Sequence, residues 1–216
     1  MKVALIDYGA GNLHSAGKAL ERAMAEAGLT GSVAIVSDAA AVASADRIVL
    51  PGDGAFADCM GQLQAAPGMI ETLERRVRRE GAPFLGICVG MQLLATQGTE
   101  HGITRGLGWI PGSVDRITPA DRTLKVPHMG WNTLDDHEPH ALTEGVKLGP
   151  DGLHAYFLHA YHLTAEDPAD VIAHADYGQP VTAIVARGNI AGAQFHPEKS
   201  QTLGLRLLAN FLRWNP

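Results

Sequence analysis

The sequence predicts an α/β fold with an open, mostly parallel central sheet flanked by helices, and three observations carry this prediction. Short continuous apolar runs, each ended by turn residues, alternate with segments of helical periodicity as far as about residue 107. Runs that are apolar along their whole length are typical of parallel strands, which are covered on both faces. Beyond that point, short β-like pieces alternate with Gly, Pro and Asp, which indicates an additional mixed or antiparallel strand region in the C-terminal half.

The first part of the chain contains the expected βα units. Apolar, β-branched runs predict strands at 3–9, 32–37, 46–52 and 83–87. Helical spacing of Leu, Ala and Met predicts helices at 12–27, 68–80 and 89–96. Gly28 directly follows the first of these helices, as expected of a glycine that ends a helix.

The second part is expected to hold shorter strands and one closing helix. The β-like pieces are SVDRI, HAYFLH, VIAHA, VTAIVARG and IAGAQFH, and the amphipathic helix spans 202–214. The chain has no internal repeat and no convincing linker. We therefore expect a single domain over residues 1–216.

Composition excludes several classes of protein. The 216 residues are 46% hydrophobic and 19% charged, which is enough to bury a core without disulfides. A net charge of −6, with one short arginine run at 75–79, argues against a nucleic-acid partner. The sequence has neither a leader peptide nor a membrane-spanning run, so we expect a cytoplasmic protein with no membrane contact. Two cysteines, Cys59 and Cys88, make no disulfide framework.

Cys88 lies where the strand at 83–87 is expected to turn into a helix. The sequence Gly-Ile-Cys-Val-Gly resembles a nucleophile elbow with Cys in place of Ser. Gly86 and Gly90 would allow the turn, because a Cβ at either position would collide with a neighbouring element. The N-terminus of the following helix would favour a thiolate. From this pentapeptide alone, a nucleophile and a small buried turn residue are equally good interpretations, whereas Cys59 is expected to be a packing residue on a helix.

His196 is the best candidate for a base that activates Cys88. It ends a strand-like run and is followed by Pro197 and Glu198, and this carboxylate is placed to orient the imidazole. The other candidates lack such a carboxylate and are expected at the surface or in packing; they are His128, His137, His140, His154, His159, His162 and His174. No Cys or His spacing fits a zinc site, so we expect no metal.

An acyl-transfer site also needs donors for an oxyanion. The backbone N–H of Val89, directly after the cysteine, is one candidate. Gly52 and Gly54 flank Asp53, whose backbone N–H is therefore a second candidate. An ordinary glycine-rich turn and a phosphate cradle are the alternatives, but the sequence has no G-x-x-x-x-G-K-[ST] motif.

Together, PGDGAF, GICVGMQ and QFHPEKS resemble the class I (triad) glutamine amidotransferases, in the right order along nearly the whole chain. The resemblance implies a flavodoxin-like open sheet and a Cys88–His196–Glu198 triad that hydrolyses the side-chain amide of glutamine without a cofactor. The stretches IDYGAGNLHS, KVPHMGWN and YFLHAYH narrow it to the stand-alone glutaminase subunits of the histidine pathway. These form a heterodimer with a (β/α)8-barrel synthase subunit, to which they pass ammonia.

The resemblance also implies residue roles outside the triad. The pocket for glutamine would be formed by Gln92, His159, Ala160 and Tyr161. The face that meets the barrel would include Asn12, Met129, Trp131 and Asn132, with Trp131 equally interpretable as a core residue.

Three residues depart from the pattern of this family. Asp53 stands where an apolar residue is usual; a carboxylate close to the oxyanion would be unfavourable unless it points to solvent, so the backbone amide keeps its role and the side chain is assigned none. Val89 replaces a leucine, and Ala160 replaces a serine that would give glutamine one more hydrogen bond. A glutaminase of another pathway (vitamin B6 or purine synthesis) and a catalytically silent module of the same fold stay open as alternatives.

Overall fold

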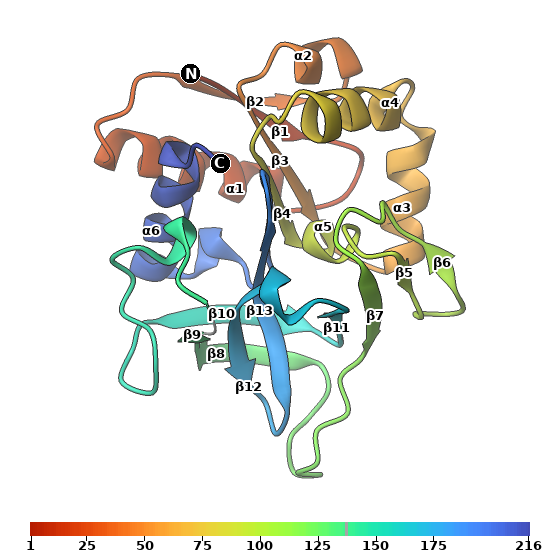
Figure 1. Cartoon of the computed structure of the whole chain (residues 1–216), viewed down its shortest axis with the longest axis vertical. Coiled ribbons are helices and arrows are strands. Elements are labelled where there is room, and N and C mark those ends of the chain that lie inside the picture. The colour runs from red at the N-terminus through yellow and green to blue at the C-terminus, as the bar shows by residue number, and fades with distance from the viewer. Residues whose placement is uncertain (137) are drawn as a thin grey trace.

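The computed structural model describes residues 1–136 and 138–216, so the expectation for His137 lies outside the described residues. The large sheet has eight strands in the order β2-β1-β3-β4-β14-β13-β12-β9 (Figure 1). The first five are parallel and the last three antiparallel; they are β2 (Ser32–Val36), β1 (Lys2–Ile6), β3 (Arg47–Gly52), β4 (Phe84–Cys88), β14 (Ile190–Ala193), β13 (Pro180–Arg187), β12 (Val171–Asp176) and β9 (Asp135–Asp136). The expected fold class is confirmed.

Helices cover both faces of the parallel part. α1 and α6 pack together on one side, and α3, α4 and α5 lie on the other (Figure 1). The helices are α1 (Leu13–Glu26), α2 (Ala39–Ala43), α3 (Phe56–Ala65), α4 (Met69–Leu73), α5 (Val89–Gln92) and α6 (Gln201–Arg213). Among the described residues no helix is both long enough and apolar enough to span a membrane.

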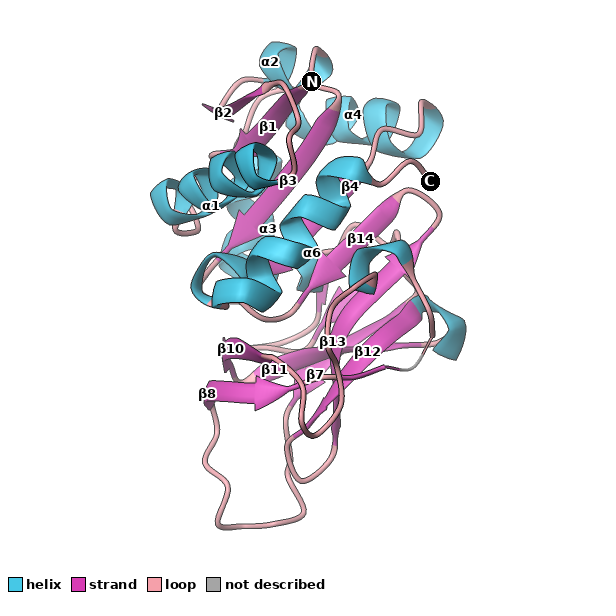
Figure 2. Ribbon diagram, turned by 90° about the vertical axis from the view of Figure 1, so that its left-hand side faces the viewer, coloured by secondary structure: helices cyan, strands magenta, loops and turns pink. Residues whose placement is uncertain are grey.

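Two smaller sheets lie beneath the C-terminal edges of the parallel strands (Figure 2). One is a two-stranded antiparallel ribbon of β8 (His128–Thr133) and β10 (His154–His159). The other has the order β11-β7-β5-β6, formed by β11 (Tyr161–Ala165), β7 (Gly112–Arg116), β5 (Gln97–Gly98) and β6 (Thr104–Arg105). The mixed strand region expected after residue 107 is therefore present.

One of the expected helices is wrong in extent, and another is partly of a different helical type. The helix expected over 89–96 ends after Gln92, because the backbone N–H groups of residues 107–110 bond the carbonyls of residues 93–95 and pull that segment into turns. The helix expected over 68–80 is α4 followed by a π-helical turn (Glu74–Arg79). Helix α2 was not predicted. Helix α3 was predicted only in so far as Cys59, which lies in it, was expected on a helix.

Candidate functional site

Three glycines bring the ends of β3 and β4 and the start of α5 into direct backbone contact. A Cβ on Gly90 would lie 1.9 Å from the carbonyl oxygen of Leu50, and one on Gly86 would lie 2.4 Å from the carbonyl oxygen of Gly90. A Cβ on Gly52 would lie 2.8 Å from the backbone nitrogen of Gly90. We call Gly52, Gly86 and Gly90 the glycine corner; the close approach explains why the sequence has glycine at these positions.

Cys88 occupies a backbone conformation that side chains rarely adopt. Its φ is 55° and its ψ is −114°, at the last residue of β4 and directly before α5. Such a conformation costs free energy and persists only where the surroundings impose it, as the glycine corner does here. Because α5 has only four residues, the helix dipole expected to favour a thiolate is small, and nearby side chains must supply most of the electrostatic stabilisation.

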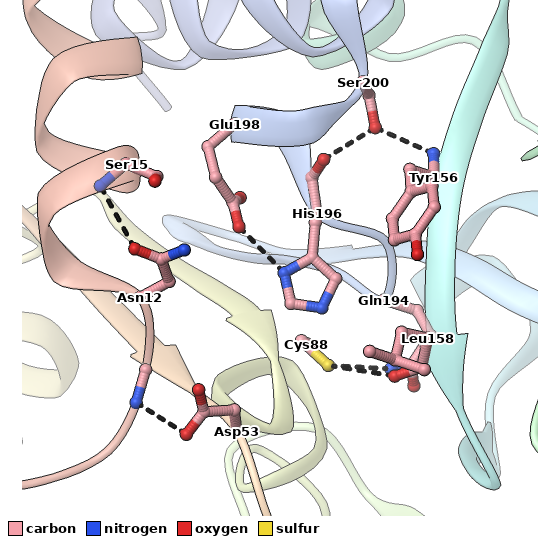
Figure 3. Close-up of polar contacts among 11 residues, drawn as sticks. Asn12, Ser15, Asp53, Cys88, Tyr156, Leu158, Gln194, His196, Glu198 and Ser200 are labelled. Atoms are coloured by element: carbon pink, nitrogen blue, oxygen red, sulfur yellow. Dashed lines mark hydrogen bonds and ion pairs between the residues drawn. The ribbon is translucent and has the colours of Figure 1, made fainter. Parts of the chain in front are cut away.

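His196 reaches the thiol from the loop that follows β14. It lies at the start of a 3₁₀ turn (Pro197–Lys199), and its ring points toward the sulfur of Cys88 (Figure 3). Its Nδ1 lies 2.9 Å from Oε1 of Glu198, whose side chain is buried. Burial lowers the pKa of His196, but hydrogen bonds to Cys88 and Glu198 more than compensate and raise it to about 10.

The three residues predicted as a triad therefore come together from two separate segments of the chain. Ser200 contributes as well, because its Oγ donates to the carbonyl of His196 at 2.6 Å and accepts from the backbone N–H of Tyr156 at 2.9 Å (Figure 3). These bonds fix the backbone of the His196 turn against β10. The sequence did not single out Ser200.

A cavity of about 350 Å³ opens above Cys88. This volume is at the lower end of the range for small-ligand sites. Its walls include most of the residues predicted for the oxyanion and substrate sites, namely Asp53, Val89, Gln92, His159, Ala160 and Tyr161, together with Asn12. Gly52 lies in the glycine corner just behind the wall, whereas Met129, Trp131 and Asn132 belong to the β8–β10 ribbon beside the cavity.

Asp53 is exposed, and its carboxylate is also held by a hydrogen bond. Oδ1 accepts a hydrogen bond from the backbone N–H of Gly11 at 2.9 Å (Figure 3). The backbone carbonyl of Asp53 accepts from the thiol of Cys59 at 3.1 Å. Residue 53 is therefore held from the β1–α1 loop on one side and from α3 on the other.

Gln92 is buried and holds the wall of the cavity together. Its Nε2 donates to the carbonyl of Tyr161 at 2.8 Å and to Oε1 of Gln194 at 3.1 Å. Gln194 in turn points its Nε2 at the sulfur of Cys88, 3.8 Å away. Both Gln92 protons are thus bound by protein, which leaves its carbonyl oxygen as the group that can meet a ligand.

Sequence reasoning missed two polar residues of the site. Gln194, two positions before His196, is fully buried beside the thiol. Glu100 lines the cavity and accepts from the backbone N–H of Phe56 at 2.9 Å. A buried Gln within an otherwise apolar strand was a usable signal for the first. Nothing local marks Glu100, which reaches the site through the fold of the β5–β6 hairpin.

The remaining histidines are distributed as expected between packing and the surface. His128, His159 and His162 are buried, whereas His154 is exposed. Within residues 1–136 and 138–216, no group of three or more His, Cys, Asp or Glu side chains is arranged to hold a metal ion.

The geometry agrees with comparisons to known proteins. The family model for class-I glutamine amidotransferases matches residues 4–214. The chain belongs to this family. Relatives named "Imidazole glycerol phosphate synthase subunit HisH" are 58% identical in Agrobacterium fabrum and 57% identical in Rhizobium meliloti, each over the full length of both chains.

Solved structures show the same fold at low sequence identity. A crystal structure of a glutamine amidotransferase superposes with a TM-score of 0.71 at 21% identity and covers 98% of this chain and 97% of its own. Another, from Thermotoga maritima, has a TM-score of 0.59 at 18% identity and covers 92% of this chain and 76% of its own. At these identities the likeness supports the fold alone.

Proposed function

We propose that this chain is the glutaminase subunit of an imidazole glycerol phosphate synthase. It hydrolyses glutamine to glutamate and ammonia and passes the ammonia to a (β/α)8-barrel synthase subunit. The observation that carries the chemistry is the buried Cys88–His196–Glu198 arrangement at the floor of a small cavity. The full-length relatives named above carry the assignment to this synthase.

The reaction follows from the positions of these side chains. Cys88 attacks the carboxamide carbon as a thiolate, which a protonated His196 beside it stabilises. The backbone N–H groups of Val89 and Asp53 are the proposed donors to the oxyanion. His196 then gives its proton to the departing ammonia and activates water to hydrolyse the thioester, while Glu198 keeps Nδ1 protonated.

Glutamine would be held at its amino-acid end by the opposite wall. The carbonyl oxygen of Gln92 and the carboxylate of Glu100 both accept hydrogen bonds and suit an α-ammonium group. The side chains of His159 and Tyr161 close the same wall. No step requires a cofactor, because a thiolate and fixed donors are sufficient for amide hydrolysis.

The partner would dock on the outer face of the β8–β10 ribbon. Met129 and Trp131 are 66% and 48% exposed there, and Leu158, opposite Met129 in the register, is 40% exposed. An apolar stripe of this kind beside a cavity is typical of a protein interface. Asn12, on the rim of the cavity, would extend this face. We propose that the heterodimer works in the cytoplasm and that residues 1–216 act as one domain.

The test is glutamine hydrolysis by the purified chain, alone and with a barrel synthase subunit and its ligand. We expect low activity alone, a large rise with the partner, and none for Cys88→Ala. Met129→Lys should weaken association with the partner, and Ile35→Lys, on the exposed edge strand β2, is the matched control that should not. High activity that ignores the partner would refute the coupling. Capture of a different synthase would favour another pathway, and a wild type whose thiol resists a glutamine-like electrophile would favour a silent module.

A further inference from the structure

Two buried histidines face each other across the β8–β10 ribbon, behind the apolar stripe. The register pairs His128 with His159, and both side chains are almost fully buried. His128 also stacks between the rings of Phe157 and Tyr177, with ring centroids 4.6 and 4.0 Å away. His159 lines the cavity above Cys88, whereas His128 lies one layer behind it.

Hydrogen bonds connect these rings in a single direction. Nδ1 of His159 lies 2.9 Å from the carbonyl oxygen of Tyr161, which can only accept, so this nitrogen carries the proton. Nε2 of a neutral His159 is then an acceptor, and Nδ1 of His128, 3.2 Å away, must donate to it. Nε2 of His128 is therefore an acceptor in its turn, and Nδ2 of Asn132, 3.4 Å away, donates to it.

The orientation of the Asn132 side-chain amide, at the end of these hydrogen bonds farthest from Cys88, is determined by two further contacts. Oδ1 of Asn132 accepts from the backbone N–H of Thr133 at 2.9 Å, and Nδ2 also donates to the carbonyl of Asp176 at 2.8 Å. The amide can therefore present only its NH₂ group to His128. Burial lowers the pKa of His128 to about 4 and that of His159 to about 3, so both rings are neutral at neutral pH.

The near end of the series is the wall of the glutamine pocket. The carbonyl of Tyr161 that accepts the hydrogen bond from Nδ1–H of His159 also accepts one from Nε2 of Gln92, at 2.8 Å. Nε2 of Gln92 also donates to Gln194, whose own Nε2 donates to the sulfur of Cys88. A continuous set of hydrogen bonds thus runs from Asn132, at the edge of the ribbon, to the thiol.

We propose that Asn132 and His128 are positioning residues of the glutamine site, which hold His159 in its Nδ1–H tautomer and thereby fix the Tyr161 carbonyl and the Gln92 amide. The effect on glutamine rests on the proposed function, whereas the tautomers do not. If His159 carried its proton on Nε2 instead, two lone pairs would face each other at Nδ1 and the Tyr161 carbonyl, and the wall would have to move.

Asn132→Asp is the sharpest perturbation, because it changes the side chain by one NH₂ group. One carboxylate oxygen can still accept from Thr133, and the other would face Nε2 of His128, which must now carry a proton. The proton on Nδ1 of His128 is then lost, or the ring becomes charged. Asn215→Asp adds the same charge at an exposed position away from the ribbon and is the matched control.

The experiment combines histidine ¹⁵N NMR with steady-state kinetics in the presence of the barrel subunit. In the wild type we expect His128 and His159 to show protonated Nδ1 and unprotonated Nε2. In Asn132→Asp we expect a protonated Nε2 on His128 and a roughly three- to tenfold rise in the KM for glutamine, with kcat changed less than twofold. Asn215→Asp should leave both the ¹⁵N pattern and the KM at wild-type values.

A wild-type His159 protonated on Nε2 would overturn the proposal without any variant. An Asn132→Asp protein in which His128 carries its proton on Nε2 but the KM for glutamine is unchanged would also overturn it. If the Asn132→Asp protein does not fold, Asn132→Ala replaces it, which removes the NH₂ donor to His128 without adding a charge; a raised KM is then expected, and a wild-type KM would contradict the proposal. An inactive wild type with the expected ¹⁵N pattern would refute the proposed function and leave the histidine arrangement standing.

Discussion

Replacing Cys88 by glycine should stabilise the protein relative to replacing it by alanine. Alanine keeps the Cβ that makes φ = 55° and ψ = −114° costly, and glycine removes it. Such strain destabilises the folded state by about 1–3 kcal/mol for a non-glycine residue. The greater freedom of glycine in the unfolded chain lowers the stability of the glycine variant by about 0.4–1 kcal/mol, which offsets part of this gain. We therefore expect the free energy of unfolding of Cys88→Gly to exceed that of Cys88→Ala by about 1.3 kcal/mol, the midpoint of a range of about 0–2.6 kcal/mol.

Urea unfolding of the two variants measures this difference directly, provided that the m-values agree. The same pair of substitutions at Cys59 is the control, because Cys59 lies inside helix α3. There glycine should be less stable than alanine by about 1 kcal/mol. If Cys88→Gly were also the less stable member of its pair, the backbone at residue 88 would not be strained and the argument from the glycine corner would fail.

Three further predictions concern protonation and packing. His196 should titrate near pH 10 by NMR. Cys88→Ala should lower the pKa of His196, because it removes the hydrogen bond to the thiol. The stability that this raised pKa contributes is fully present below pH 6.5 and is lost as the pH rises through about 10. Gly90→Ala should lower the free energy of unfolding by about 3 kcal/mol, because its Cβ would meet a β3 carbonyl. Gly61→Ala, with open space around it, should stabilise helix α3 by about 0.5–1 kcal/mol; urea unfolding measures both. His159 has a folded pKa of about 3, so between pH 6.5 and 3 only the unfolded chain binds a proton at this residue. The free energy of unfolding should therefore decrease as the pH falls from 6.5 to 3, and a His159→Asn variant that loses the same amount of stability in acid would contradict this.

The parts of the site that could be predicted are those encoded by neighbouring residues. The glycines around Cys88 and the Pro197 that separates His196 from Glu198 are local patterns with a physical reason, so the sequence predicted by number that Cys88, His196 and Glu198 would come together. The alternation of apolar strands with helices likewise predicted the parallel sheet.

The rest depends on contacts between distant segments. Helix α5 is short because the backbone N–H groups of residues 107–110 bond the carbonyls of residues 93–95 directly after it, and no pattern within 89–96 indicates this. Gln194 reaches the sulfur of Cys88 from just after β14, and Glu100 reaches the cavity from the β5–β6 hairpin. The direction of the bonds from Asn132 to His159 depends on how β8 pairs with β10.

The glycine corner also determines where the specificity of this pocket can be altered. Gly52, Gly86 and Gly90 have no room for even a methyl group, so any attempt to reshape the floor of the cavity from behind Cys88 meets neighbouring backbone. Ala160 and Tyr161, in the wall, have side chains of different sizes and are not glycines packed against neighbouring backbone. Libraries aimed at amides larger or smaller than glutamine should vary that wall and leave the floor unchanged.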